Sequence, residues 1–121
     1  MRTGRVVVDM KKIEAIVRPE RLEDVKDALA AINIRGITVT QIVGCGVQNG
    51  WTEIYRGNEY QLNFLPKVKI EIVADNDRSE EIIDVIVNNA RTGEIGDGKI
   101  FVSEISDVVR IRTGERGKIA L

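Results

Sequence analysis

The pattern that most constrains the fold is a strand, a helix and a second strand, which occurs twice along the chain. Apolar and polar residues alternate in residues 11–17, as in a strand with one buried face, and an apolar strand follows at residues 36–46. The same order returns with strands at residues 65–74 and 99–105. Between the strands of each pair, apolar residues recur at helical spacing. The two stripes are Leu22, Val25, Leu29 and Ile32 in the first half and Ile82, Val85, Ile86 and Ala90 in the second.

The order of these segments predicts an α+β fold. A β-α-β-β-α-β succession matches the split ferredoxin-like sandwich, in which an antiparallel sheet carries two helices on one face. The halves are of similar length, which is consistent with a duplicated unit. Pro19 is expected in the first turn of the first helix, and Asn76 or Asp77 is expected to cap the second. Residues 108–112, "VVRIR", are predicted to add a short fifth strand.

Composition narrows the class of protein. A chain of 121 residues is expected to form one domain, and its net charge of −1 argues against a general nucleic-acid binder. The absence of histidine excludes Ser-His-Asp and Cys-His catalysis and the usual zinc sites. No apolar run is long enough to span a membrane, and the single cysteine, Cys45, cannot form an intrachain disulfide. We therefore expect a cytoplasmic protein with no nucleic-acid partner and no direct membrane insertion.

A glycine-rich turn precedes the last strand. "TGEIGDGKIFV", residues 92–102, contains three glycines, and Asp97-Gly98 is a strong signal for a hairpin turn. The same glycines would let backbone N–H groups approach an anion closely, and Lys99 would add a positive charge. This stretch alone leaves both alternatives open, a hairpin and a phosphate-binding loop.

The connection between the second and third strands is long. Residues 46–63 have neither clean periodicity nor an apolar stripe, and a connection of this length is usually functional or disordered. Pairing within residues 52–62 would make it a projecting β-ribbon. Exposed aromatic side chains, as expected for Trp51, Tyr55 and Tyr60, are instead typical of a binding loop. We therefore interpret the connection as an interaction loop, with the ribbon as the alternative.

Three separated motifs carry a family resemblance. They are "YRGNEYQLNFLPKVKIEIV" at residues 55–73, "TGEIGDGKIFV" at residues 92–102 and "RIRTGE" at residues 110–115. In this order and spacing they resemble the PII signal-transduction proteins of nitrogen regulation, from Met10 to about Glu115. The resemblance implies a homotrimer of ferredoxin-like subunits that binds ATP or ADP in each cleft between subunits. It also implies that 2-oxoglutarate is sensed together with Mg-ATP, so the expected cofactors are ATP, ADP and Mg²⁺.

The resemblance also divides the chain into functional segments. A single PII-like domain would cover residues 10–121. Its T-loop, at about residues 46–63, would dock onto target proteins, and its B-loop, at about residues 92–99, would wrap the nucleotide phosphates. A C-terminal segment would cover about residues 110–121. Residues 1–9 would then be a native extension or a start-codon artefact, since their codons can resemble a ribosome-binding site.

Ten residues are expected to contact the nucleotide through this resemblance. The B-loop residues 96–99 are implied to hold phosphates, which favours the phosphate-binding alternative for the glycine-rich turn. Arg110 and Arg112 lie two apart, so a strand would point both the same way, toward one polyphosphate. A charged edge strand is the alternative for this pair. The full set is Thr38, Gly46, Gln48, Glu71, Gly96, Asp97, Gly98, Lys99, Arg110 and Arg112.

A 2-oxoglutarate site is implied beside the nucleotide. Gln48 matches the glutamine that helps ligate the Mg²⁺ ion and closes over the ligand, and Lys67 matches a lysine that pairs with a ligand carboxylate. Asn49 and Gly50 complete the expected site. A dicarboxylate next to a triphosphate requires a cation between them, which suits this arrangement. The alternatives are a polar loop residue for Gln48 and a solvated strand end for Lys67.

Several residues depart from the family pattern. Val47 stands where an arginine is common, which removes one charged nucleotide contact, and Trp51 stands where many members have histidine. Tyr60 matches the tyrosine that is modified by uridylylation, although Asn58 replaces the usual alanine. The cyanobacterial type carries a phosphorylated serine at the position of Asn58, so that switch is expected to be absent.

The function expected from the resemblance is regulation rather than catalysis. Through its T-loop the protein would regulate an ammonium transporter or a nitrogen-metabolism enzyme, and a transporter partner would recruit it to the membrane. A small phosphate-handling enzyme on a ferredoxin-like fold is the alternative, disfavoured because the chain has no histidine and no obvious pair of nucleophile and base. A single-strand nucleic-acid binder that stacks bases on Trp51 and the tyrosines is disfavoured by the charge balance.

Overall fold

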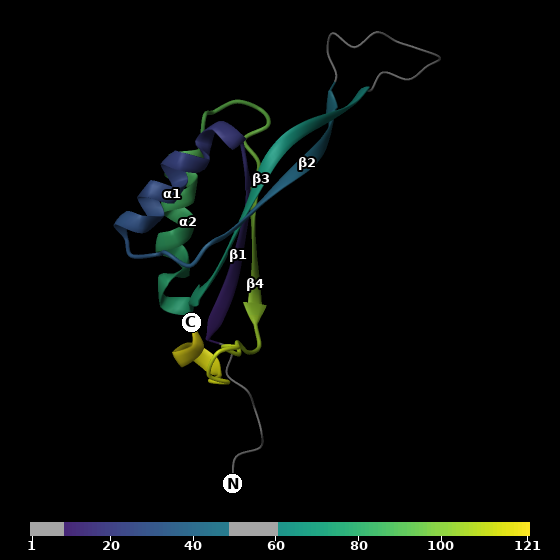
Figure 1. Ribbon diagram of the computed structural model, residues 1–121. Helices are drawn as coiled ribbons and strands as arrows, with labels where there is room; N and C mark the ends of the chain where they lie inside the picture. The colour runs from purple at the N-terminus through teal and green to yellow at the C-terminus, as the bar shows by residue number, and fades with distance from the viewer. Residues whose placement is uncertain (1–8, 49–60) are drawn as a thin grey trace.

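The structure, a computed structural model, describes residues 9–48 and 61–121 (Figure 1). The order of its elements confirms the predicted β-α-β-β-α-β succession. Within these residues, no helix is both long and apolar enough to cross a membrane. The elements are β1 (Met10–Val17), the 3₁₀ turn η1 (Pro19–Arg21), α1 (Leu22–Ala31), β2 (Thr38–Gln48), β3 (Gln61–Asp75), α2 (Asn76–Ala90), β4 (Lys99–Ile105) and the 3₁₀ turn η2 (Gly117–Ala120).

The four strands form one antiparallel sheet in the order β2-β3-β1-β4, and both helices cover the same face of it (Figure 1). The core lies between these two layers, and the predicted helical stripes supply its helical side. This arrangement confirms the ferredoxin-like sandwich. The most completely buried large side chains are Ile13, Leu29, Ile70, Ile72, Ile82, Ile86, Val17 and Val25.

The opposite face of the sheet carries no helix and is called the open face below. Because side chains alternate between the two faces of a strand, the residues between the core positions point to the open face. The cross-strand register places on it Lys12, Glu14 and Ile16 of β1, Lys67, Lys69 and Glu71 of β3, and Lys99 and Phe101 of β4.

Pro19 and Asp75 mark the starts of the two helical segments. Pro19 opens η1 directly before α1, as predicted. The cap of α2 is Asp75, whose carboxylate accepts a hydrogen bond from the Asp77 amide at 3.0 Å. The prediction of Asn76 or Asp77 as the cap is therefore wrong. The reason is that β3 runs into α2 without a loop, so the last residue of the strand also caps the helix.

The β2–β3 hairpin projects beyond the body of the molecule (Figure 1). Its register runs from Thr38 opposite Glu71 to Gln48 opposite Gln61, so the pairing includes the first and last residues of the predicted loop. The predictions for the rest of this loop stay predictions. The residues concerned, Asn49, Gly50, Trp51, Tyr55, Asn58 and Tyr60, lie outside the described residues.

The predicted fifth strand at residues 108–112 is wrong. The chain turns at residues 111–113 instead, and a single bridge joins Val109 to Arg116. Gly114, with a φ of 75°, reverses the chain direction, and its amide donates to the Arg110 carbonyl at 2.7 Å. The apolar and basic residues of this segment alternate as in a strand. The local hydrogen bonds nevertheless close a tight turn, so the segment does not pair with the sheet.

Candidate nucleotide and effector site

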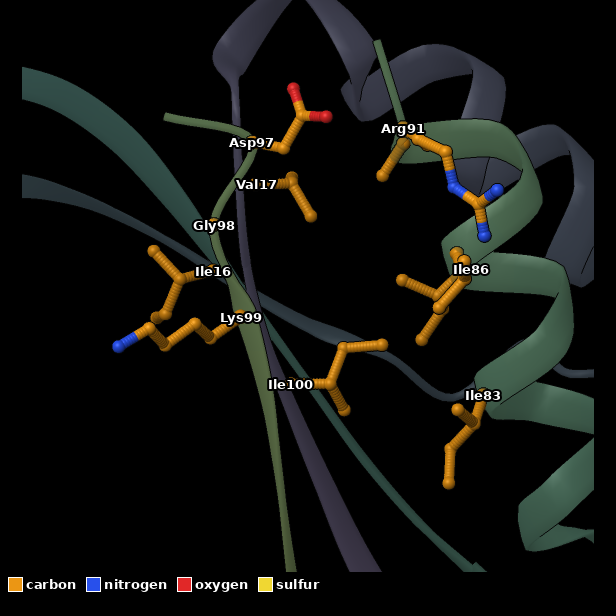
Figure 2. Close-up of a pocket in the computed structure, with 11 residues that line it drawn as sticks. Ile16, Val17, Ile83, Ile86, Arg91, Asp97, Gly98, Lys99 and Ile100 are labelled. Carbon is orange, nitrogen blue, oxygen red and sulfur yellow. The ribbon is translucent and has the colours of Figure 1, made fainter. Parts of the chain in front are cut away.

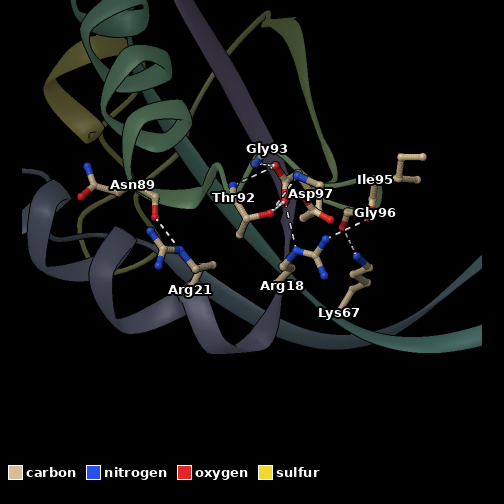
Figure 3. Close-up of polar contacts among 10 residues, drawn as sticks. Arg18, Arg21, Lys67, Asn89, Thr92, Gly93, Ile95, Gly96 and Asp97 are labelled. Carbon is tan, nitrogen blue, oxygen red and sulfur yellow. Dashed lines mark hydrogen bonds and ion pairs between the residues drawn. The ribbon is translucent and has the colours of Figure 1, made fainter.

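Asp97 organises the glycine-rich loop between α2 and β4 (Figure 3). One of its carboxylate oxygens accepts hydrogen bonds from the amides of Thr92 and Gly93, both at 2.9 Å, and the other accepts from the Thr92 hydroxyl. The Thr92 hydroxyl, these amides and the Arg18 guanidinium hold the pKa of Asp97 well below its usual range. The carboxylate of Asp97 is therefore committed to the loop itself, and only its backbone is free to serve a ligand.

Two cations fasten the loop to the sheet (Figure 3). Arg18 donates from Nε to Asp97 at 3.0 Å and from a terminal nitrogen to the Ile95 carbonyl at 2.9 Å. Lys67 donates from Nζ to the Gly96 carbonyl. Because the C=O and N–H of a peptide point in opposite directions, these contacts turn the amides of Gly96 and Asp97 away from the two cations. No described group accepts a hydrogen bond from either amide, so both remain available to an anion.

Gly98 brings the loop into close contact with β1. Its φ is +99°, and a Cβ added there would lie 1.8 Å from the Ile16 carbonyl oxygen. Glycine is therefore required twice over at this position, by the backbone conformation and by the space. The expected role of Gly98 in phosphate binding stays a prediction, and the role that the structure shows is to hold the loop against the strand.

A hollow of about 490 Å³ opens on the open face beside this loop. Lys99 points toward it and away from α2, as Figure 2 shows for its side chain. Lys67, Gly96 and Asp97 line the same hollow, so two lysines and the glycine-rich loop surround one space, and Glu94 also lines it. This arrangement suits a polyanion. The hollow is called the loop half-site, and its other lining residues include Ile16, Gly44, Leu65 and Phe101.

A second hollow, of about 460 Å³, lies further along the open face. Thr38 and Glu71 oppose each other across β2 and β3 and line it together with Lys12 of β1. Lys12 Nζ lies 2.7 Å from a Glu71 carboxylate oxygen, and this hydrogen bond lowers the pKa of Glu71. This hollow is called the strand half-site. Its walls also include Gly36 and Val73, which give it an apolar side.

The two half-sites are separate within one copy of the chain. Lys67 and Glu71, one from each, are four residues apart on β3, which corresponds to about 13 Å along a strand. The structure thus divides the predicted nucleotide residues instead of gathering them. Gly96, Asp97, Gly98 and Lys99 line one hollow, together with the predicted 2-oxoglutarate ligand Lys67, and Thr38 and Glu71 line the other.

The two predicted arginines lie in the C-terminal segment, at the end of the sheet remote from the glycine-rich loop (Figure 1). The Arg110 guanidinium donates to the Glu115 carboxylate at 2.7 Å and to the carbonyls of Ile119 and Leu121 at 3.0 and 3.4 Å. Arg112 lies in the exposed turn at residues 111–113. The two arginines do not share a strand, so the geometric reason given for directing both toward one polyphosphate is wrong.

The remaining predicted ligands lie along β2. Gly46 opposes Asn63 and Gln48 opposes Gln61, further along the hairpin than Gly44 of the loop half-site. Among residues 9–48 and 61–121, no group of three acidic, cysteine or histidine side chains is placed to hold a metal ion. A divalent ion near Gln48 would therefore need ligand oxygens from a bound nucleotide or acid.

Three residues that shape these sites, Arg18, Thr92 and Glu115, are absent from the predicted set. Arg18 binds partners 77 and 79 residues away, so no local spacing could have revealed it. Thr92 and Glu115 lie inside the recognised motifs. The signal that could have indicated Thr92 is its position five residues before an aspartate in a glycine-rich turn. The signal for Glu115 is its position five residues after an arginine.

The fold and the two half-sites are those of a small ligand-binding regulatory protein, and comparison with known proteins gives the family. The chain belongs to the family of the nitrogen regulatory protein P-II, whose family model matches residues 10–115. It is 55% identical over 112 residues to the nitrogen regulatory protein P-II of Rhizobium meliloti strain 1021 and 54% identical over 112 residues to P-II 1 of Escherichia coli strain K12. Each of these alignments covers 93% of this chain and 100% of the relative.

Two solved structures are similar along nearly the whole chain. Arabidopsis thaliana PII bound to citrate has a TM-score of 0.77 and 46% identity, and the match covers 94% of both chains. The GlnK-ATP complex of B. subtilis has a TM-score of 0.80 and 35% identity, and the match covers 93% of this chain and 96% of that one.

These comparisons settle the class of function. The relatives are named as nitrogen regulatory proteins, so this chain is a signalling protein of nitrogen regulation and not an enzyme. None of them supports the alternative of a small phosphate-handling enzyme.

Proposed function

We propose that the protein is a homotrimeric sensor of ATP, ADP and 2-oxoglutarate that regulates nitrogen-metabolism targets through its T-loop. The observation that carries this proposal is the division of the predicted nucleotide residues between two half-sites on one open face. In a ring of three copies, the loop half-site of one copy would face the strand half-site of the next. Each cleft would then hold one nucleotide. A relative solved as an ATP complex supports the choice of ligand.

The open face also supports the ring. Phe101 and Leu65 are 55% and 50% exposed there, and β2 and β4 are the two edge strands of the sheet. Contacts between two different surfaces of the same chain close into a ring when the rotation allows it. Light scattering is expected to give three times the 13.5 kDa mass of one chain. A stable monomer at micromolar concentration would remove the shared-site proposal.

Replacing Lys99 with alanine is expected to weaken ATP binding about tenfold to a hundredfold. The substitution deletes a charge-assisted contact in the loop half-site, a loss of roughly 1.5–3 kcal/mol. Calorimetry with Mg-ATP measures the change. Lys26→Ala is the matched control, because Lys26 pairs with Glu23 on the exposed side of α1 and lines neither half-site. Unchanged affinity in Lys99→Ala would mean that the loop is only a hairpin.

Replacing Glu115 with glutamine is expected to strengthen ATP binding. Arg110 must exchange its contact with Glu115 for a phosphate, and the neutral amide competes less well for the guanidinium than the carboxylate does. An exposed ion pair is worth up to about 1 kcal/mol, so the gain is roughly two- to fivefold. Calorimetry with Arg110→Gln and the double variant completes the test. If Glu115→Gln strengthens binding equally in the Arg110→Gln background, Arg110 is not the phosphate ligand.

The 2-oxoglutarate site is proposed at Gln48, Asn49, Gly50 and Lys67, with Mg²⁺ held by Gln48 and the nucleotide phosphates. Lys67 has three N–H donors and uses one for the Gly96 carbonyl, so it can also donate a hydrogen bond to a carboxylate of the ligand. A neutral glutamine oxygen is an acceptable Mg²⁺ ligand, and the bound nucleotide would supply charged ones. The donor set therefore fits an ion that binds together with its ligands. A relative bound to citrate supports an organic acid in this class of protein.

The family supports a proposal for the targets. We propose an ammonium transporter or a nitrogen-metabolism enzyme as the partner, with the protein in the cytoplasm and recruited to the membrane by a transporter. Tyr60 is proposed as a uridylylation site. Capture of partners from native lysate, with and without ATP plus 2-oxoglutarate, tests this: the identity of the retained protein should change with 2-oxoglutarate. Mass spectrometry of Tyr60 in nitrogen-starved cells tests the modification.

A further inference from the structure

A groove of about 370 Å³ lies on the other side of the sheet, where α2 leaves the edge strand β4 incompletely covered (Figure 2). Its walls are aliphatic. Ile83 and Ile86 point into it from α2, and Val17 and Ile100 point into it from β1 and β4, as Figure 2 shows. Val87 and Ala90 complete the wall on the helix. The groove lies on the helix-bearing face, whereas the half-sites lie on the open face. Its lining shares four residues with the loop half-site, namely Ile16, Asp97, Gly98 and Lys99.

One uncommitted charge stands at the groove. Arg91 follows the last residue of α2, and its guanidinium has no hydrogen bond or ion pair with the described residues. The other charged groups that line the groove are occupied or turned away. The Asp97 carboxylate is bound by Arg18, Thr92 and Gly93, and the Lys99 side chain points to the open face (Figure 2).

The charges around the groove leave an excess that favours an anion, because the Arg18 guanidinium compensates the Asp97 carboxylate at 3.0 Å. The carboxyl end of α2 contributes a partial negative charge of about half a unit, which the full positive charge of Arg91 exceeds. A pocket with aliphatic walls and one uncompensated charge suits a ligand with an apolar body and a single opposite charge. We propose that this groove binds an amphipathic carboxylate, with an unbranched acyl chain along the aliphatic wall and its carboxylate on Arg91.

Octanoate is the probe for this proposal. In a titration of the ¹⁵N-labelled full chain, the amides expected to shift most are those of residues 83–91 and 98–100. Lengthening the acid from hexanoate to octanoate should strengthen binding about fourfold for each methylene that enters the groove. Octanol should bind more weakly than octanoate, and octyltrimethylammonium should not shift these amides. Equal affinity for the alcohol, or shifts centred on the open face, would overturn the proposal.

The variants test the charge and the shape separately. Arg91→Gln should weaken octanoate binding roughly fivefold, the size of an exposed ion pair, while Arg35→Gln, an exposed arginine elsewhere, should leave it unchanged. Val87→Phe should fill the groove and remove the shifts; if this variant does not fold, the ligand series in the unaltered protein still decides. Saturating Mg-ATP should not displace octanoate. Displacement would place the acid in the nucleotide site and overturn the inference without touching the proposed sensor function.

Discussion

Replacing Gly98 with alanine is expected to lower the free energy of unfolding by about 3 kcal/mol or more and to abolish ATP binding. A side chain at a φ of +99° is strained by about 1–3 kcal/mol, and the new Cβ would also lie 1.8 Å from the Ile16 carbonyl oxygen. Relieving that overlap requires the loop to leave β1. The loop half-site depends on this contact, so stability and binding should fail together, as measured by urea unfolding and by calorimetry.

Two other glycines distinguish the cost of the backbone conformation from the cost of the overlap with Ile16. Gly93 has a φ of +92° but open space around its added Cβ, and Gly36 has neither a positive φ nor a neighbour within 4 Å. Gly93→Ala should therefore cost about 1–2 kcal/mol from conformation alone, and Gly36→Ala should cost almost nothing. If Gly98→Ala were no more destabilising than Gly93→Ala, the close approach to Ile16 would not be what makes Gly98 necessary.

The core of this protein was predictable from sequence because it depends on short-range periodicity. Ile82, Ile86 and Ala90 recur at helical spacing and are buried together, and the alternating residues of β1 and β3 are buried on the facing side. Burying these stripes leaves few ways to stack two helices on one sheet. The fold class follows from that restriction, without knowledge of any single contact.

The errors arise where local hydrogen bonds compete with periodicity. Residues 108–112 alternate as a strand does, yet the turn at Gly114 and the contacts of Arg110 hold them in a closed segment. Similarly, Asp75 serves both as the end of β3 and as the cap of α2. Propensity rules treat a strand end and a helix cap as separate signals, so they place the cap one or two positions after the residue that serves as both.

The sequence could offer the candidate site only as a set of residues, not as an arrangement. Motif matching selected Lys99 and Glu71 as parts of one nucleotide site, and the structure places them in different hollows. The organising contact between Arg18 and Asp97 spans 79 positions and leaves no trace in local spacing. A site shared between copies of a chain also leaves no trace in local spacing, because sequence order carries no information about which copy supplies each residue.

Charge in the loop half-site predicts that 2-oxoglutarate binding depends on the nucleotide. The ligand is a dianion, and its proposed place lies beside the proposed phosphate position. There Lys67 already donates to the Gly96 carbonyl of the glycine-rich loop. Two anions in one hollow repel each other unless a metal ion bridges them. Gln48 offers that ion only a neutral oxygen, so the ion's other ligands must come from the triphosphate and from the acid itself.

We therefore expect 2-oxoglutarate to bind in the presence of Mg-ATP and not to bind with ADP or after addition of EDTA. Gln48 ends β2 at the base of the T-loop, so a change of its ligation is expected to reach Trp51, the only tryptophan of the chain. Its fluorescence should change on adding 2-oxoglutarate with Mg-ATP and stay flat in the other two conditions, while Trp51→Phe should remove the signal without removing the binding measured by calorimetry.

A ligand that favours one state of the loop disfavours any partner that needs the other state, so binding of the target and binding of 2-oxoglutarate would be reciprocally linked. A response to 2-oxoglutarate without nucleotide would refute this mechanism, and no binding in any condition would indicate that Val47 and the other departures leave a sensor of ATP and ADP alone.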